Sequence, residues 1–409
     1  MLNHIWAGLI LLALASAALQ ALTGADAQVL ARMTQALIDC GKLGFELAIG
    51  LTGMLCLWLG LLAIAEAAGL VALLSKGLRP LFVHLFPQVP KDHPAMGSMS
   101  LNIAANMLGL DNAATPLGLR AMAQLQTLNP HPEQATSAQT LFLIINTASV
   151  TLLPVSVLTY RAQLGAAQPA DVFLPLLLTS LSATLIGVIV AGFCLRLNLR
   201  HPVVLAYGAG LFALIATVTL SLNGASSEYM QQVSQYFSQG LLLITVAGFL
   251  LAGVVKKVPV YEVFINGAKE GFSTAVTLIP YLVAMFLAIS LLRASGSLDM
   301  ALHGVKTCVN FFGFDARWVD ALPTMILKSL SGSGARASML DVMRVQGADS
   351  FAGRLVSIIQ GSSETTFYVL TVYFGSVGIR RCGIALGCAL VADVAAAVLG
   401  VIYCYGFFG

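Results

Sequence analysis

The chain has 409 residues, of which 58% are hydrophobic and only 10% are charged, and its formal net charge is +3. Soluble domains carry roughly 25% charged residues, so a composition this poor in charge excludes a cytosolic globular enzyme. The basic residues form no block or stripe, which argues against a nucleic-acid partner. We therefore expect an all-α, polytopic integral membrane protein.

About nine full spans are predicted, because a helix needs about 20 apolar residues to cross a bilayer. The first span has an alternative interpretation as a signal peptide, since Ala25-Asp26-Ala27 matches an A-x-A cleavage pattern. It lacks the Lys or Arg of a signal n-region, so we favour a retained helix. The predicted spans are 1–22, 44–65, 138–160, 172–197, 203–222, 239–255, 273–292, 352–374 and 382–405.

Two further regions, about 93–125 and 322–347, are polar and glycine-rich and flank apolar runs too short to span. We interpret both as broken or re-entrant helices. In the first region, Asn102 and Asn106 are four residues apart and share a helix face, and Gly109 is a natural helix stop.

The next helix is expected to start at Thr115, with Pro116 at its first helical position. Asp111 and Asn112 would then lie in an unwound stretch. Such a stretch is tolerated at membrane depth only inside protein or beside water. A helix N-terminus there offers free N–H groups to a polar or anionic solute. The alternative is a surface loop between two amphipathic helices.

In the second polar region, serine and glycine alternate around Ser331 and Ser333. Small residues let a ligand or another backbone approach closely. Lys328 and Arg336 add fixed positive charge. The alternative interpretation is close helix packing.

Polar residues also mark two of the predicted full spans. Asn146 and Ser149 lie on one, and Gln360, Ser363 and Glu364 share a face of the other. A carboxylate within a span is costly unless it faces a cavity or has a partner. Glu364 is therefore the main candidate for coupling to protons or cations. The alternative for the uncharged residues is hydrogen bonding between helices.

Glu66 and Asp393 are the other carboxylates deep in predicted helices. Glu66 is a second coupling candidate, with a snorkelling position at a helix end as the alternative. For Asp393, the alternative to a functional role is an ion pair with an Arg of a neighbouring helix. The histidines and cysteines lack metal-ligand spacing, and no nucleophile or nucleotide motif occurs. We expect no metal, no cofactor, no catalytic residue and no enzyme.

The sequence repeats itself, because residues 42–45 (KLGF) align with 269–272 (KEGF), and the same register pairs Ala48 with Ala275. A second block, after a gap, aligns 144–151 with 358–365. Five predicted crossings separate Lys42 from Lys269, and an odd number places the halves upside down relative to each other. Inverted repeats that meet at the midplane are typical of secondary transporters. The alternative is chance similarity between Ala/Leu/Gly-rich helices.

Long motifs occur at 57–61, 85–96 and 102–118 in the first half and at 257–262, 267–272, 330–335, 347–350 and 361–368 in the second. They resemble the bacterial spore maturation proteins A and B, which belong to the nucleoside recognition, or gate domain, family. The resemblance implies two such proteins fused near residue 200, with an A-like gate half at 1–200 and a B-like gate half at 201–409.

The resemblance implies a multi-pass protein of the bacterial cytoplasmic (inner) membrane, with the lipid bilayer and a small polar solute as partners, and it allows a homodimer. We expect a secondary transporter or permease for a small polar solute, with an anion favoured. The solute is expected to bind at the midplane between the two broken helices. The alternative function is a non-transporting membrane scaffold or regulator of cell-envelope (peptidoglycan or spore) maturation. The predicted substrate-binding residues are Asn102, Asn106, Asp111, Asn112, Thr115, Asn146, Ser149, Ser331, Ser333, Arg336, Gln360 and Ser363, and the predicted coupling residues are Glu364 and Glu66.

Overall fold

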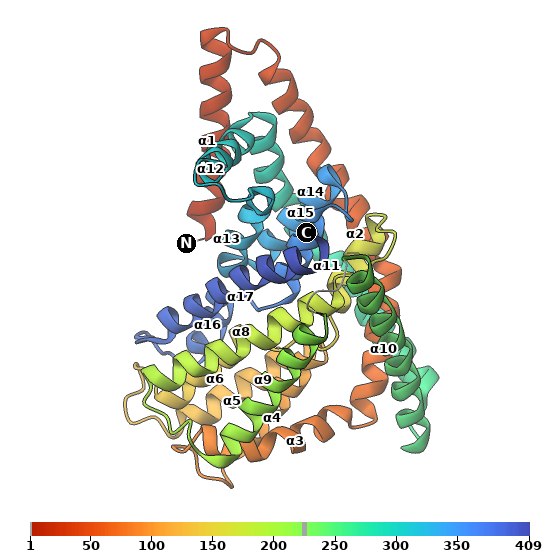
Figure 1. The fold of residues 1–409 in the computed structure, drawn as a ribbon, viewed down its shortest axis with the longest axis vertical. Coiled ribbons are helices and arrows are strands. Elements are labelled where there is room, and N and C mark those ends of the chain that lie inside the picture. The colour runs from red at the N-terminus through yellow and green to blue at the C-terminus, as the bar shows by residue number, and fades with distance from the viewer. Residues whose placement is uncertain (1, 223–226) are drawn as a thin grey trace.

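The computed structural model describes residues 2–222 and 227–409, and within these residues the chain folds into helices with one isolated β-bridge. Seven of the described helices are long and apolar enough to cross a membrane (Figure 1). The all-α, multi-pass membrane fold is thus confirmed. The seven are α1 (Leu2–Thr23), α2 (Val29–Ala67), α8 (Phe173–Cys194), α9 (Pro202–Leu222), α10 (Ser227–Val255), α11 (Val260–Ala294) and α17 (Ala385–Phe408).

Two of the nine predicted spans, 138–160 and 352–374, are wrong as continuous helices, because each is interrupted in its middle. Pro154 has no N–H to donate and disfavours the helical conformation of the residue before it. In the other span, a run of serine and threonine residues offers the backbone competing hydrogen bonds. The resulting segments are α6 (Ser137–Thr147) and α7 (Val155–Gln163), and α15 (Phe351–Gly361) and α16 (Thr366–Ser376).

The two predicted broken regions are present as pairs of short helices, α4 (Pro94–Met107) with α5 (Asp111–Gln126), and α13 (Leu322–Leu330) with α14 (Gly332–Gln346). Gly109 ends the first helix as expected, with a positive φ of 73° that glycine adopts without strain.

The predicted start of the following helix at Thr115 and Pro116 is wrong. Helix α5 begins at Asp111, so Asp111 and Asn112 are helical rather than unwound. Asp is among the residue types favoured at helix starts, so the sequence permits this earlier start as well as the one at Thr115.

The two halves follow the same order of elements. Each has a long helix, a short amphipathic helix, a pair of half-helices, a broken helix and a final span. Gly69 and Gly296, which are paired by the register of the first repeat block, both have positive φ and precede the short helices α3 (Leu70–Leu85) and α12 (Ser297–Phe311). A 3₁₀ turn at Arg317–Ala321 follows α12.

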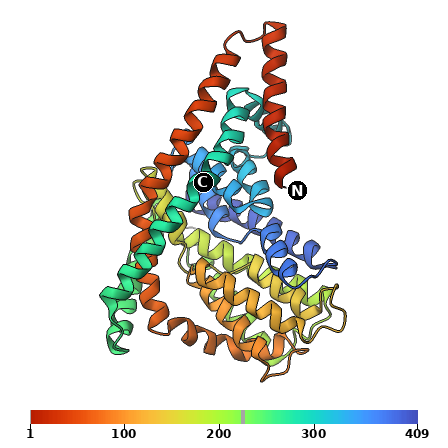
Figure 2. The ribbon, with the colours of Figure 1, turned by 180° about the vertical axis from the view of Figure 1, so that it is seen from behind.

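The halves are inverted, because their long helices α2 and α11 run antiparallel along each other (Figure 2). Gly44 lies against Val283, while Cys56, further along α2, lies against Gly271, which is earlier in α11. A Cβ at Gly271 would come within 2.6 Å of the Cα of Cys56, so the close approach requires glycine.

The long helices exceed the thickness of a bilayer. At 1.5 Å per residue, the 39 residues of α2 extend about 58 Å, roughly twice the hydrocarbon core. Helix α2 therefore crosses with a strong tilt or extends beyond the lipid. Helix α1 forms a hairpin with it and packs on α11, where the Trp6 indole donates to the Ala284 carbonyl at 2.7 Å.

Candidate functional site

A polar cavity of about 110 Å³ lies where the interrupted helices of the two halves meet. Both half-helix pairs and both broken helices contribute to its lining. Irregular backbone at membrane depth is stable only where it lines such a cavity or is buried in protein. The lining residues that matter most for charge and hydrogen bonding are Asn106, Tyr160, Lys328, Arg336, Gln360 and Glu364.

The interruptions of the two broken helices contact each other directly. The Glu364 N–H donates to the Thr147 carbonyl at 2.8 Å, so the residue after α15 is hydrogen-bonded to the end of α6. Thr184 on α8 also donates its hydroxyl to the Ala148 carbonyl. These bonds satisfy backbone groups that the interruptions leave free.

Three helix N-termini reach the cavity. Val155, Gly332 and Thr365, at the starts of α7, α14 and α16, all belong to its lining. The starts of α7 and α16 have no side-chain cap hydrogen bond, whereas Ser331 caps α14 by accepting from the Gly334 N–H. Free N–H groups and the positive ends of the helix dipoles favour an anion.

The first half contributes a network of neutral amides. Asn106 donates to the Asn146 side-chain oxygen at 2.8 Å, and Asn102 donates to the Ala114 carbonyl at 2.8 Å. The Tyr373 hydroxyl of α16 joins both asparagines, at 3.2 Å from Asn102 and 3.3 Å from Asn146. The network thus ties α4 and α6 of the first half to the second half.

The second half contributes charge. The Lys328 ammonium donates to the Gln360 carbonyl at 2.7 Å, and the Arg336 guanidinium lies 5.7 Å from the centre of the Tyr160 ring. Arg336 forms no ion pair with any carboxylate whose side chain is described. With Glu364 as the one opposing charge among the described lining residues, two cations leave the cavity with net positive charge.

Two buried polar atoms at the cavity have no hydrogen-bond partner among the described residues. They are the Nε of Arg336 and the Oε1 of Gln360. A donor and an acceptor left unpaired in this way are costly unless something else satisfies them. Both are available to a polar solute or to water.

The structure places the predicted site residues in three groups. Asn106, Arg336, Gln360, Ser363 and Glu364 line the cavity. Ser363 and Glu364 do so from the interruption between α15 and α16, so the prediction that they share a helix face is wrong. The others whose side chains are described lie outside the lining. Asn102 and Asn146 belong to the amide network, Ser149 and Thr115 lie in the α6–α7 interruption and in α5, Ser331 and Ser333 lie at the start of α14, and the side chains of Asp111 and Asn112 fall outside the described residues.

Glu66 is exposed at the C-terminal end of α2 and does not line the cavity. Its position matches the snorkelling alternative, so we do not carry it further as a coupling residue. No sequence pattern pointed to Tyr160 or Tyr373, because a tyrosine in an apolar helix is usually an interfacial or packing residue. In the fold, Tyr373 lies against Gly118, where a Cβ would meet the Tyr373 hydroxyl.

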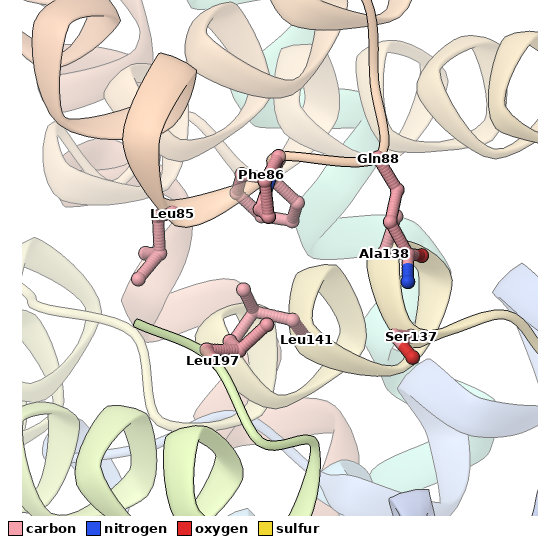
Figure 3. A pocket seen from close by; sticks show the side chains of 8 residues that line it. Leu85, Phe86, Gln88, Ser137, Ala138, Leu141 and Leu197 are labelled. Atoms are coloured by element: carbon pink, nitrogen blue, oxygen red, sulfur yellow. The ribbon is translucent and has the colours of Figure 1, made fainter. Parts of the chain in front are cut away.

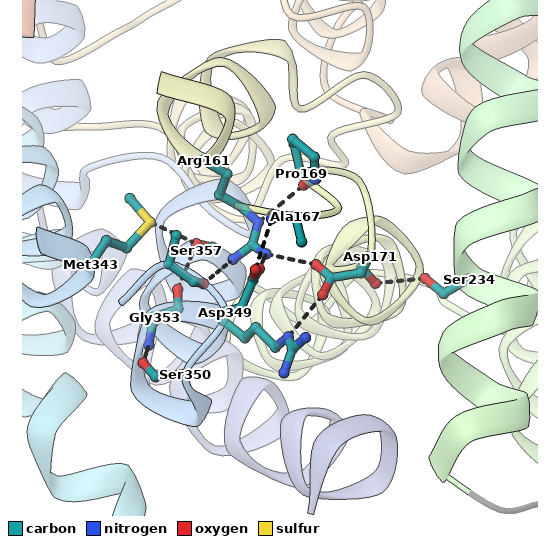
Figure 4. Close-up of polar contacts among 12 residues, drawn as sticks. Arg161, Ala167, Pro169, Asp171, Ser234, Met343, Asp349, Ser350, Gly353 and Ser357 are labelled. Atoms are coloured by element: carbon teal, nitrogen blue, oxygen red, sulfur yellow. Dashed lines mark hydrogen bonds and ion pairs between the residues drawn. The ribbon is translucent and has the colours of Figure 1, made fainter. Parts of the chain in front are cut away.

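At one end of the broken helix α6–α7, a buried ion cluster joins the halves (Figure 4). The fully buried Arg161 pairs with Asp171 at 2.8 Å and with Asp349 at 2.9 Å. It also donates to the Ala348 carbonyl at 2.6 Å, and Arg354 pairs with Asp171 at 2.8 Å. The loop after α7 is thereby fixed to the loop before α15.

At the other end of the same broken helix, the halves are joined mainly by backbone hydrogen bonds. The N–H groups of Arg380 and Arg381 donate to the Glu133 carbonyl at 3.0 and 2.9 Å, and the Ala135 N–H donates to the Arg381 carbonyl. Within the first half, the fully buried Gln139 donates to Gln126 at 2.7 Å, and Gln126 donates to the Val377 carbonyl of the second half at 3.3 Å. A small hollow nearby, of about 10 Å³, is lined mainly by apolar groups such as Leu85 and Leu141 and is too small for a solute (Figure 3).

These features define a multi-pass membrane protein of two inverted halves around a polar cavity. Residues 48–164 and 275–380, together more than half of the chain, match the model of the Gate family, described as nucleoside recognition. The chain therefore belongs to this family. The two matched segments begin at Ala48 and Ala275, the pair that the register of the first repeat block aligns.

Two relatives are separate proteins that each correspond to about half of this chain. Spore maturation protein B of Bacillus subtilis (strain 168) is 42% identical over 178 residues, which cover 44% of this chain and 98% of that protein. Spore maturation protein A of the same organism is 36% identical over 190 residues, which cover 46% of this chain and 93% of that protein. The chain thus resembles the two proteins fused. No solved structure gives a significant match.

Proposed function

We propose that this protein is a secondary transporter or permease of the bacterial cytoplasmic (inner) membrane for small polar, anionic solutes. The observation that carries the proposal is the shared polar cavity that the interrupted helices of both inverted halves line, with net positive charge. Interrupted helices that meet at a shared site are the usual binding architecture of inverted-repeat transporters.

In this proposal, Arg336 and Lys328 attract the anion. The N-termini of α7 and α16 add N–H donors, and Asn106, Gln360 and Ser363 complete the hydrogen bonds. Arg336 is the main anchor, because its Nε is buried without a partner and no described carboxylate neutralises it. A planar guanidinium also suits the two oxygens of a carboxylate or phosphate.

Alternating access would come from one half rocking against the other along the α2–α11 pair, with the cavity opening first at one end of α6–α7 and then at the other. Glu364 lies in the cavity and is a proposed coupling carboxylate. This function needs no cofactor and no covalent step, and we propose that the protein is not an enzyme.

The test is counterflow of labelled inorganic phosphate, succinate, glutamate and acetate into proteoliposomes that contain the full-length protein. We expect at least one anion to enter faster than into empty liposomes, and Arg336→Gln to reduce that rate about tenfold or more, because a charge-assisted hydrogen bond contributes about 1.5–3 kcal/mol. The matched control is Arg344→Gln, because Arg344 lies on the same helix, is exposed and is not in the lining.

Flux equal to that of empty liposomes for every probe would contradict the proposal. The alternative, a membrane scaffold or regulator of cell-envelope maturation, rests on the names of the two relatives. It predicts no flux, and it predicts that Arg336→Gln and Arg344→Gln behave alike.

A further inference from the structure

Asp393 is a carboxylate inside the span α17 that the proposed function above does not use. Its Oδ2 accepts a hydrogen bond from the Thr366 hydroxyl at 2.8 Å, and its buried Oδ1 has no hydrogen-bond partner among the described residues. Thr366 is the first residue of α16. The carboxylate therefore lies where the interrupted helices of the second half converge, next to the positive end of α16.

Lys328 connects this carboxylate to the cavity. Its charge attracts Asp393, its ammonium donates to the Gln360 carbonyl, and its side chain, only 6% exposed, lines the cavity. Helices α6, α8 and α16, which pack against α17, carry no charged residue, and α10, which also packs against α17, has its one charged residue, Glu228, in its first turn. Of the described charges on α13 and α15, Arg354 is paired with Asp171, which leaves Lys328 as the cation that acts on Asp393.

The first half shows that the fold does not need a carboxylate here. Helix α8, the final span of the first half, carries no carboxylate, and at the α6–α7 interruption its Ser180 hydroxyl meets the Thr151 N–H at 3.5 Å. A neutral serine serves at the junction where the second half has Asp393. A carboxylate that is costly in a membrane and unnecessary for the architecture indicates a function.

We propose that Asp393 is a proton-binding site that Lys328 links to anion binding. In the empty cavity, the Lys328 ammonium neutralises the Asp393 carboxylate. When an anion enters, the ammonium turns toward it, and Asp393, now without its counter-charge, takes up one proton from water to become a carboxylic acid. One proton and one negative charge then cross together. Release of the anion returns Lys328 to Asp393 and expels the proton. This step rests on the proposed function.

The first experiment needs no substrate. The infrared C=O band of protonated carboxylic acids is followed against pH in the full-length protein in liposomes. Asp393→Asn is expected to remove one titrating band, and Lys328→Met to move the protonation of that band about one pH unit or more higher, because a nearby opposite charge stabilises a carboxylate by this amount or more. Arg336→Met, which removes the other cavity cation, is the control and is expected to move it less.

Either of two results would overturn the proposal: an Asp393→Asn spectrum identical to that of the unmodified protein, or a band that Lys328→Met and Arg336→Met move equally. If Asp393→Asn does not fold, Lys328→Met against Arg336→Met still decides the question.

The second experiment separates this inference from the function on which it rests. For an anion that passes the counterflow test, Asp393→Asn is expected to keep exchange at equal pH on both sides but to lose accumulation driven by a pH gradient. Asp393→Glu is expected to restore that accumulation. Undiminished accumulation in Asp393→Asn would refute the coupling role. Absence of flux for every probe would refute transport itself, while the infrared titration would still report on proton binding.

Discussion

The two ends of the broken helix α6–α7 are joined to the second half by different chemistry, although the repeat makes them equivalent. Thr136 caps α6 and Ser350 caps α15, and the register of the second repeat block pairs these two residues. Beside Ser350 lies the ion cluster around Arg161, whereas beside Thr136 lie backbone hydrogen bonds and the amide of Gln139. The two inverted halves are therefore similar in geometry, but the interactions that join them differ in strength at the two ends of α6–α7.

Loss of Arg161 is the largest effect we expect at either end. Arg161→Met leaves the buried Asp171 with one of its two cations and frees the Ala348 carbonyl. Removing one partner of a buried ion pair costs about 3–5 kcal/mol, so the free energy of unfolding is expected to fall by that amount. Thermal unfolding in detergent measures it. A loss below about 1 kcal/mol would mean that the cluster does not hold the halves together.

The same substitution is expected to open the cavity toward the ion cluster. Ser156 lines the cavity, so its replacement by cysteine reports access. In a background without the native cysteines, Arg161→Met should raise the reaction rate of Ser156→Cys with a membrane-impermeant maleimide about tenfold from one side only, the factor for about 1.4 kcal/mol. Equal acceleration from both sides would show that the variant loosens the whole fold instead.

Gln139→Leu tests the end beside Thr136 and should cost less. It leaves the Gln126 side chain and the Thr136 N–H without the partner that Gln139 supplies. An unpaired buried polar group costs about 1–3 kcal/mol, less than a broken buried ion pair. Thermal unfolding in which Gln139→Leu is more damaging than Arg161→Met would reverse this ranking of the two ends.

Arg380→Met should have the smallest effect. Its ion pair with Glu133, at 3.5 Å, is between side chains that are 79% and 65% exposed. Exposed pairs contribute about 0–1 kcal/mol and are screened by salt. We expect a change in unfolding free energy of no more than about 0.5 kcal/mol, and none at high salt. The backbone bonds that residues 380 and 381 make with Glu133 remain in this variant.

Much of the fold could be predicted from composition and repeat. Gly109 and the serine–glycine run near Ser331 interrupt helices as expected, because their conformational preferences are local. The interruptions after Thr147 and Gly361 were missed, because the flanking residues are apolar enough for an unbroken span and hydropathy does not register unwinding.

The site could be predicted in part. Polar residues at membrane depth need a cavity or a partner, and five of the predicted residues lie in the lining for that reason. The ion cluster could not be predicted, since Arg161 and Asp349 are 188 residues apart and meet only through the tertiary fold. The sequence identifies Asp393 as a carboxylate deep in a helix. Its electrostatic interaction with Lys328 could not be predicted, because it depends on how α13 packs against α17.

The glycine contacts between α2 and α11 have a consequence for the ratio in which the two halves must be made. Gly60 and Gly267 bring the long helices α2 and α11 together, and the cavity is complete only when both halves are present. If the chain were divided after α8, the two products would have to associate through the contact between α2 and α11. Any excess of one product would then remain without the other half of the cavity lining. Translation as one polypeptide removes that hazard, because every molecule made carries one copy of each side.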